Sequence, residues 1–202
     1  MKRSALLVLV LLALAGCSPL AGRPQPVVTH VLTLPPAPAT PAGAGRGSLI
    51  LAPVDAPDVH QALNLIYSRS PGTLAQYQYA RWSDLPPRAF AALLRQRLAE
   101  SGQFQAVAGL GAGVRGDWQL NVRLAEFHHD AATPPGNGRV VLDAELVDRR
   151  DGRLVDRRVF RAEAPAPSFD AAGAARALGE ASGRVLDDLA TWLARVRPAE
   201  AR

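Results

Sequence analysis

The sequence has little cysteine, little lysine and no long hydrophobic run. Its 202 residues include one cysteine, which excludes an intrachain disulfide, so a folded domain must rely on a hydrophobic core. Lysine occurs only at position 2, and the arginines are interleaved with aspartate and glutamate, so no basic block typical of nucleic-acid binding is present. The sequence also contains no G-x-S-x-G motif, the signature of one class of hydrolase nucleophile.

The longest apolar run, residues 5–15, is informative because of its flanks. As a helix it is too short to span a bilayer core of about 30 Å, which takes roughly 20 residues. It follows the positively charged start Met1-Lys2-Arg3 and leads into Leu14-Ala15-Gly16-Cys17, where small residues precede the cysteine. This pattern predicts a signal peptide over residues 1–16. Cleavage would remove two positive charges and lower the formal net charge from +5 to +3.

Leu14-Ala15-Gly16-Cys17 resembles the lipobox of bacterial lipoproteins. The resemblance implies that Cys17 becomes the mature N-terminus and carries a diacylglyceryl group and an N-acyl chain such as palmitate. Two or more chains are needed, because a single acyl chain gives only marginal membrane binding. Ser18 follows, where an aspartate usually signals retention at the inner membrane, so the resemblance implies the inner leaflet of the outer membrane, facing the periplasm. The alternative is an ordinary cleaved signal peptide with an incidental Cys17.

Residues 17–47 are predicted to form the lipidated cysteine and a tether. Seven prolines lie between positions 18 and 47, a composition typical of a semi-extended linker. Thirty such residues in polyproline conformation would span on the order of 90 Å at about 3.1 Å per residue. The β-branched stretch Val27–Leu34 interrupts this composition and could add an edge strand.

A single domain is predicted over residues 48–197, followed by a short tail at 198–202. Period-two patterns and turn residues predict strands at 48–54, 62–67, 74–82, 104–107, 118–124, 140–148 and 154–163. A helix is predicted to begin at Pro86-Pro87 and end at Ser101-Gly102, and a second to cover 169–197 with Ser168 as N-cap. Three glycines in the second helix (Gly173, Gly179 and Gly183) suggest that its first half frays or that the helix starts late. The order of elements predicts a two-layer α+β fold, with two helices on one face of a mostly antiparallel sheet.

The best candidates for metal or acid–base chemistry are Glu126, His128, His129 and Asp130. Adjacent histidines point to opposite faces of a strand, so only one of them can join Glu126. A zinc site needs at least three protein ligands, and no further ligand stands at useful spacing, while His30 and His60 stand alone. The cluster therefore reads as a solvated strand end, and no catalytic residue, metal or cofactor is predicted. A hydrolase using His128, His129 and Glu126 remains an alternative.

A binding role has a better candidate. Large aromatic side chains and an arginine, which are enriched at interface hot spots, lie within six residues: Tyr77, Tyr79, Arg81 and Trp82. We predict that these residues contact a partner. The alternative is that the aromatics form the core of a hairpin, because a strand exposes only alternate side chains.

The same stretch also carries a family resemblance. Tyr79-Ala80-Arg81-Trp82-Ser83-Asp84-Leu85-Pro86-Pro87, followed by Leu93, Leu98 and Ser101-Gly102-x-Phe104, resembles the ABC-type transport auxiliary lipoproteins. Supporting features along the chain are the lipobox, Ile66-Tyr67, the strand at 140–148, Asp151-Gly152, Phe160 and Leu189-x-x-Trp192-Leu193. His30-Val31-Leu32 differs, since family members often carry an aromatic residue there.

The resemblance implies a non-catalytic, periplasm-facing component of an ABC-type transport system associated with MCE-domain proteins. Such systems are thought to move lipids or other hydrophobic compounds between the inner and outer membranes. The implied partners are the outer membrane, an MCE-domain protein and the ABC permease of the same system, with homo-oligomer formation left open and no nucleic acid. The alternative is an envelope lipoprotein that binds a hydrophobic ligand, or assists envelope assembly, without a transporter.

Overall fold

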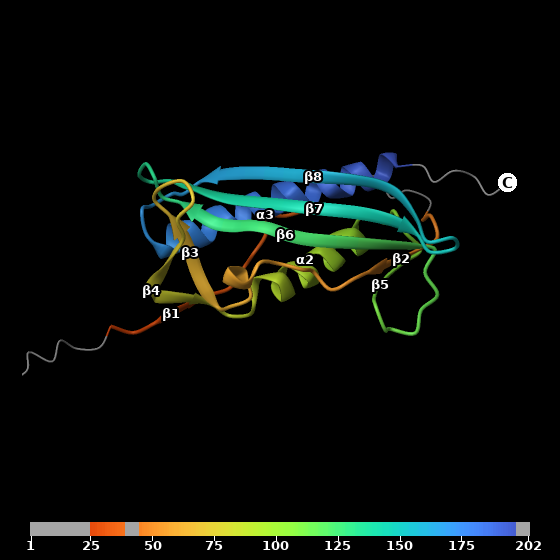
Figure 1. The fold of residues 1–202 in the computed structure, drawn as a ribbon, viewed down its shortest axis with the longest axis horizontal. Coiled ribbons are helices and arrows are strands. Elements are labelled where there is room, and N and C mark those ends of the chain that lie inside the picture. Colours follow the sequence, from red (N-terminus) through yellow and green to blue (C-terminus); the bar gives the residue numbers. More distant parts are fainter. Residues whose placement is uncertain (1–24, 39–44, 197–202) are drawn as a thin grey trace, which may run out of the picture.

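The computed structural model describes residues 25–38 and 45–196 (Figure 1). Cys17, the predicted signal peptide and the predicted tail lie outside the described residues. In chain order the elements are β1 (Val28–His30), β2 (Ser48–Leu51), the short 3-10 helix η1 (Asp58–His60), β3 (Asn64–Ser68), β4 (Ala75–Trp82), α2 (Pro86–Glu100), β5 (Ala106–Gly109), β6 (Trp118–Asp130), β7 (Asn137–Asp148), β8 (Arg153–Pro165) and α3 (Ala171–Arg195). Neither described α-helix is long and apolar enough to cross a membrane.

The sheet is organised around β6. Antiparallel β7 pairs with β6 along its length, and β8 pairs antiparallel with β7. The other edge of β6 is shared, because β2 pairs in parallel with its first residues and β3 pairs in parallel with its last. Beyond β2 lies β5, and beyond β3 lie β4 and then β1. The predicted α+β class is confirmed.

The sheet is more mixed than the predicted, mostly antiparallel one. Its longest pairings are antiparallel, but β1·β4, β2·β5, β2·β6 and β3·β6 are parallel. The chain reaches β5 and β6 from the first hairpin through α2, and a helical crossover of this kind allows strands to run in parallel. Pairing partners of this sort depend on the path of the chain, so local alternation could not reveal them.

Both α-helices cover one face of the sheet, as predicted (Figure 1). An apolar stripe of α2 lies in the core through Phe90, Leu94 and Leu98, which are almost completely buried. The N-cap of α3 is not Ser168 but Asp170, whose carboxylate accepts a hydrogen bond from the Gly173 N–H. The Ser168 hydroxyl instead donates to the Asp170 carboxylate.

The glycines of α3 mark close packing, and the helix is continuous from Ala171 to Arg195. Gly173, Gly179 and Gly183 are all buried. A Cβ added at Gly179 would lie 2.3 Å from the carbonyl oxygen of Thr33, and one added at Gly183 would lie 2.7 Å from Pro35. The predicted fraying is therefore wrong, because a chain segment that crosses the helix packs against Gly179 and Gly183, and Gly173 lies against the Ser168 carbonyl. The helix does begin two residues later than predicted, at Ala171.

That crossing segment, residues 31–35, is here named the strap. Leu32 of the strap is buried in the core, and the Pro35 carbonyl accepts a hydrogen bond of 2.9 Å from Arg97 in α2. Arg97 is itself buried and forms an ion pair with Asp187 in α3, at 3.5 Å. The strap thus lies across α3 and is bonded to α2, so part of the predicted tether is packed against the domain. The expected edge strand is present as β1, which pairs with β4.

Replacing Gly179 by alanine is expected to destabilise the domain, although alanine is the better helix former by up to about 1 kcal/mol. The new methyl group would overlap the Thr33 carbonyl and push the strap away from α3. Overpacking of this kind costs about 1–3 kcal/mol, or roughly 2–4 °C in melting temperature per kcal/mol. Thermal unfolding measures the change, with the exposed neighbour Glu180→Ala as control. A rise in melting temperature would mean that the strap does not hold this position.

Candidate functional site

The four residues predicted to contact a partner do not form one surface. Trp82 is 3% exposed and packs on Phe127, with ring centroids 5.4 Å apart, so it belongs to the core. Tyr77 is half-buried, whereas Tyr79 is 42% exposed. Arg81 is also exposed, and its Nε donates to the Thr29 hydroxyl of β1 at 3.2 Å. Only Tyr79 and Arg81 of this group therefore present their side chains to a partner.

An irregularity in β4 separates these residues. Asn64 of β3 pairs with Arg81, and Ile66 pairs with Gln76, so two steps along β3 oppose five steps along β4. The extra residues change the face to which later side chains point. A single alternation therefore does not hold along the strand, and both Tyr77 and Trp82 turn toward the interior.

Tyr77 and His129 form a buried hydrogen-bonded pair. The Tyr77 hydroxyl lies 2.7 Å from His129 Nδ1, and His129 Nε2 lies 2.9 Å from the Pro135 carbonyl. A carbonyl only accepts, so Nε2 carries a hydrogen and Nδ1 accepts from the tyrosine. Burial, aided by the Asp170 carboxylate, raises the pKa of Tyr77 to about 12, which keeps this donor protonated. Both nitrogens of His129 are thus occupied in joining β4, β6 and the loop after β6.

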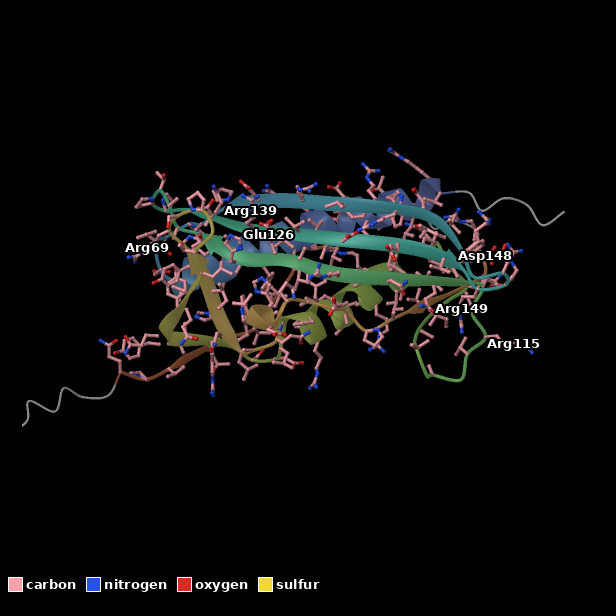
Figure 2. All side chains as sticks on the ribbon, in the orientation of Figure 1. Arg69, Arg115, Glu126, Arg139, Asp148 and Arg149 are labelled. Atoms are coloured by element: carbon pink, nitrogen blue, oxygen red, sulfur yellow. The ribbon has the colours of Figure 1, made fainter. Side chains whose placement is uncertain are left out.

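The other members of the predicted acid–base cluster line a groove on the helix-free face of the sheet. The prediction that only one of the adjacent histidines joins Glu126 is confirmed, since His128 lines the groove and His129 is buried in the interior. The groove has a volume of about 510 Å³ and lies between η1, the β3–β4 turn and the outer face of β6 and β7. Figure 2 shows Glu126 beside Arg139, and the carboxylate is 2.7 Å from the arginine Nε.

His60 also lines this groove, a position that the sequence did not reveal. It comes from η1, 66 residues before Glu126, and nothing in the local pattern links the two. Burial, aided by the nearby His128, lowers the pKa of His60 to about 4. Burial likewise lowers the pKa of His128. Both rings are therefore neutral at neutral pH, and His60 Nδ1 is buried without a hydrogen-bond partner among the described residues.

The side chains that line the groove are better suited to binding than to catalysis. The Glu126 carboxylate is engaged by Arg139, which also lies 3.5 Å from Glu163. The hydroxyls of Ser68 and Ser70 at the groove edge bond within their own turn and not to a histidine. Within residues 25–38 and 45–196, no group of three or more His, Cys, Asp or Glu side chains could hold a metal ion. The groove offers neutral rings and a compensated carboxylate to a bound molecule.

Acid is expected to destabilise the protein through His60. Above pH 6.5 the ring is neutral in both folded and unfolded chains, so it contributes no pH dependence. Between pH 6.5 and about 4 the unfolded chain binds a proton that the folded chain excludes, so stability falls with pH, by about 3 kcal/mol in all. Urea unfolding at several pH values should show a larger loss in the parent than in His60→Gln, which keeps only the smaller contribution of groups such as His128, with His30→Gln as control. An unchanged slope in His60→Gln would contradict it.

The comparisons with known proteins agree with this fold. A family model described as ABC-type transport auxiliary lipoprotein component matches residues 30–190. The crystal structure of a Xanthomonas campestris protein is similar, with 23% identity, a TM-score of 0.75, and coverage of 82% of this chain and 94% of that one. A hypothetical protein from Chlamydia trachomatis shares 10% identity with a TM-score of 0.54, covering 75% and 98% of the two chains.

These structural likenesses are too low in identity to show more than the fold, and no curated protein matches the sequence. The family model carries more weight. Its match begins at the last residue of β1 and ends within α3, so it includes the strap, the whole sheet from β2 to β8 and α2. The chain therefore belongs to the ABC-type transport auxiliary lipoprotein family.

Proposed function

We propose that this protein is the non-catalytic, outer-membrane-anchored component of an ABC-type transport system that works with an MCE-domain protein to move lipids or other hydrophobic compounds. The observation that carries the proposal is the family match over residues 30–190, which covers nearly all of the described domain. In this proposal Cys17 carries the lipid and the domain faces the periplasm. The groove, with no positioned nucleophile among its described residues, agrees with a docking role and not with turnover.

The packed strap changes the expected reach of the domain. Eleven peptide units separate Cys17 from Val28, the first residue of β1. At roughly 3.6 Å per residue they span at most about 40 Å, less than half of the length expected for a tether running to residue 47. We therefore propose that the transporter's periplasmic component extends to the outer membrane and meets the domain there. The domain does not need to extend far across the periplasm.

Photo-crosslinking in intact envelopes tests this function. A photoreactive residue in place of Tyr79, which is exposed, would capture a neighbour without disturbing the core. The same residue at Glu180, which is exposed on α3, samples a second face of the domain. Recovery of an MCE-domain protein or its permease from either bait is the expected result. Capture of envelope-assembly or peptidoglycan enzymes, with no transporter component, would overturn the proposal.

The groove of about 510 Å³ favours ligand binding as a second candidate function. The sheet–helix interface is a poorer place for a ligand, since its fully buried side chains fill it and a recess near Trp118 and Leu193 measures about 20 Å³. Solvent extraction of the purified protein, followed by mass spectrometry, would reveal a bound hydrophobic molecule. His128→Leu should alter its recovery if the molecule occupies the groove, whereas Tyr79→Ala should not.

A further inference from the structure

Strand β1 leaves one edge of the sheet open and covered with apolar side chains. It pairs with β4 on one side and is the last strand on the described sheet's path. Val27 and Val28 are each 52% exposed, and Val31 is 64% exposed. Three of five consecutive residues are thus valines with at least half of their surface uncovered.

This edge lacks the charged residues that protect many sheet edges. Proteins usually guard open edges with charged residues, especially lysine, or with bulges that turn the edge away. Here no Asp, Glu, Lys or Arg occurs between positions 24 and 45. An uncharged edge with exposed valines is suited to a covered position and not to free solution.

The neighbouring strand adds two side chains that suit a membrane interface. Thr29 pairs with Arg81, so the exposed Tyr79 lies next to the start of β1. Tyrosine favours the boundary between headgroups and acyl chains, because its ring is apolar and its hydroxyl is polar. An arginine near the surface attracts lipid phosphates. We name this set, comprising Val27, Val28, Val31, Tyr79 and Arg81, the anchor-side patch.

The length of the preceding chain brings this patch close to the lipid anchor. Gln25, the first described residue, is eight residues after Cys17. Eight residues span at most about 29 Å at roughly 3.6 Å per residue. The loop between β5 and β6 lies at the opposite end of the domain (Figure 1). The 13-residue strand β6 alone extends about 43 Å at roughly 3.3 Å per residue, so that loop can stand well clear of the membrane.

We propose that the anchor-side patch rests on the phospholipid surface to which Cys17 is attached. The inference depends on the lipid anchor of the proposed function and adds a fixed orientation to it. The valines and Tyr79 enter the headgroup layer, and Arg81 pairs with lipid phosphates. Strand β1 has three residues, so a partner strand would gain only a short ladder of hydrogen bonds, which favours lipid as the occupant. The opposite end of the domain then points into the periplasm.

Nitroxide labels on the lipidated protein test this orientation. The chain has a single cysteine, and lipidation occupies its thiol, so a new cysteine is the only labelling site. Val28→Cys and Val31→Cys place the label in the anchor-side patch. Val114→Cys is the matched control, since Val114 is 43% exposed and belongs to the loop at the far end. The lipidated variants are placed in vesicles of phosphatidylethanolamine and phosphatidylglycerol, after mass spectrometry has confirmed the acyl chains.

The measured quantity is the accessibility of each nitroxide label to two paramagnetic reagents. Oxygen concentrates in the bilayer, whereas a water-soluble nickel complex stays outside it. Labels at 28 and 31 should become at least about threefold less accessible to nickel than the label at 114. Equal accessibility at all three positions in a protein of correct lipidated mass would overturn the inference and leave the transport role standing. Strong coupling between labels at position 28 would also overturn it, because a second copy would then cover the edge. A protein without the acyl mass would instead contradict the anchor of the proposed function.

Discussion

Replacing Trp82 by alanine is expected to lower the free energy of unfolding by about 3–5 kcal/mol, the usual cost of truncating a buried aromatic side chain. Trp82 is 3% exposed and packs against Phe127 on β6, while its backbone N–H donates to the Leu63 carbonyl at 2.7 Å. The substitution would leave a cavity where the bent β4 meets the centre of the sheet. Urea unfolding followed by circular dichroism measures the loss.

The paired variant Tyr79→Ala separates stability from binding. Tyr79 lies three residues earlier in the same strand but is exposed, so its removal should change the free energy of unfolding by less than about 0.5 kcal/mol. A loss of partner capture in Tyr79→Ala would locate a binding contact, whereas the same loss in Trp82→Ala would report unfolding. A Trp82→Ala protein as stable as its parent would contradict the core position of this side chain.

The regular part of the fold could be predicted because its residues follow simple periods. In β6 and β7, long alternation of apolar and polar residues matches one buried and one exposed face. Pro86-Pro87 and Gly102 mark the limits of α2 as expected, and Gly102 adopts a positive φ of 62° beyond the helix end. Each of these signals depends only on neighbouring residues, so it can be recognised from the sequence alone.

The strap could not be predicted from local pattern. It lies within a proline-rich stretch that is equally typical of a free linker, and its packing depends on glycines about 150 residues later in α3. The glycines gave the opposite signal, since glycine lowers helix propensity when nothing packs against it. The strap and the glycines explain each other, because the strap can approach α3 this closely only where Gly179 and Gly183 lack a side chain. The composition of each segment taken alone could not show that the strap packs on these glycines.

The residues of the candidate site could be predicted only in part, for the same reason. Glu126 and His128 share a strand face two residues apart, which alternation predicts. His60 joins them through the path of the chain between β2 and β3, and the bend in β4 moves Trp82 inward through extra residues that no pattern marks. The order of weak motifs along the whole chain was the stronger signal, and the family match confirms it.

The largest functional effect is expected from removing the cysteine at the mature N-terminus. A Cys17→Ala chain, exported behind an ordinary cleavable signal so that position 17 still begins the mature protein, should leave the membrane fraction almost completely. Each buried methylene contributes about 0.8 kcal/mol, so loss of the acyl chains removes essentially all of the anchoring free energy. We expect at least about a tenfold shift of the protein into the soluble periplasmic fraction. Fractionation with a carbonate wash, and the mass of the mature chain, measure the outcome.

The fold of the released chain should be unchanged, because the strap and the hydrophobic core are built from residues after position 30. Its melting temperature should therefore match that of the parent within about 1 °C, whereas the Gly179→Ala variant should stay on the membrane with a lower melting temperature. Because Cys17→Ala changes only the membrane attachment and Gly179→Ala only the stability, the two variants separate anchoring from folding. The anchor-side patch contributes at most weak binding alone, since valines, a tyrosine and an arginine bury far less apolar surface than acyl chains. A Cys17→Ala chain that remains in the membrane after the wash would place the anchor elsewhere and would contradict the lipidation proposed here.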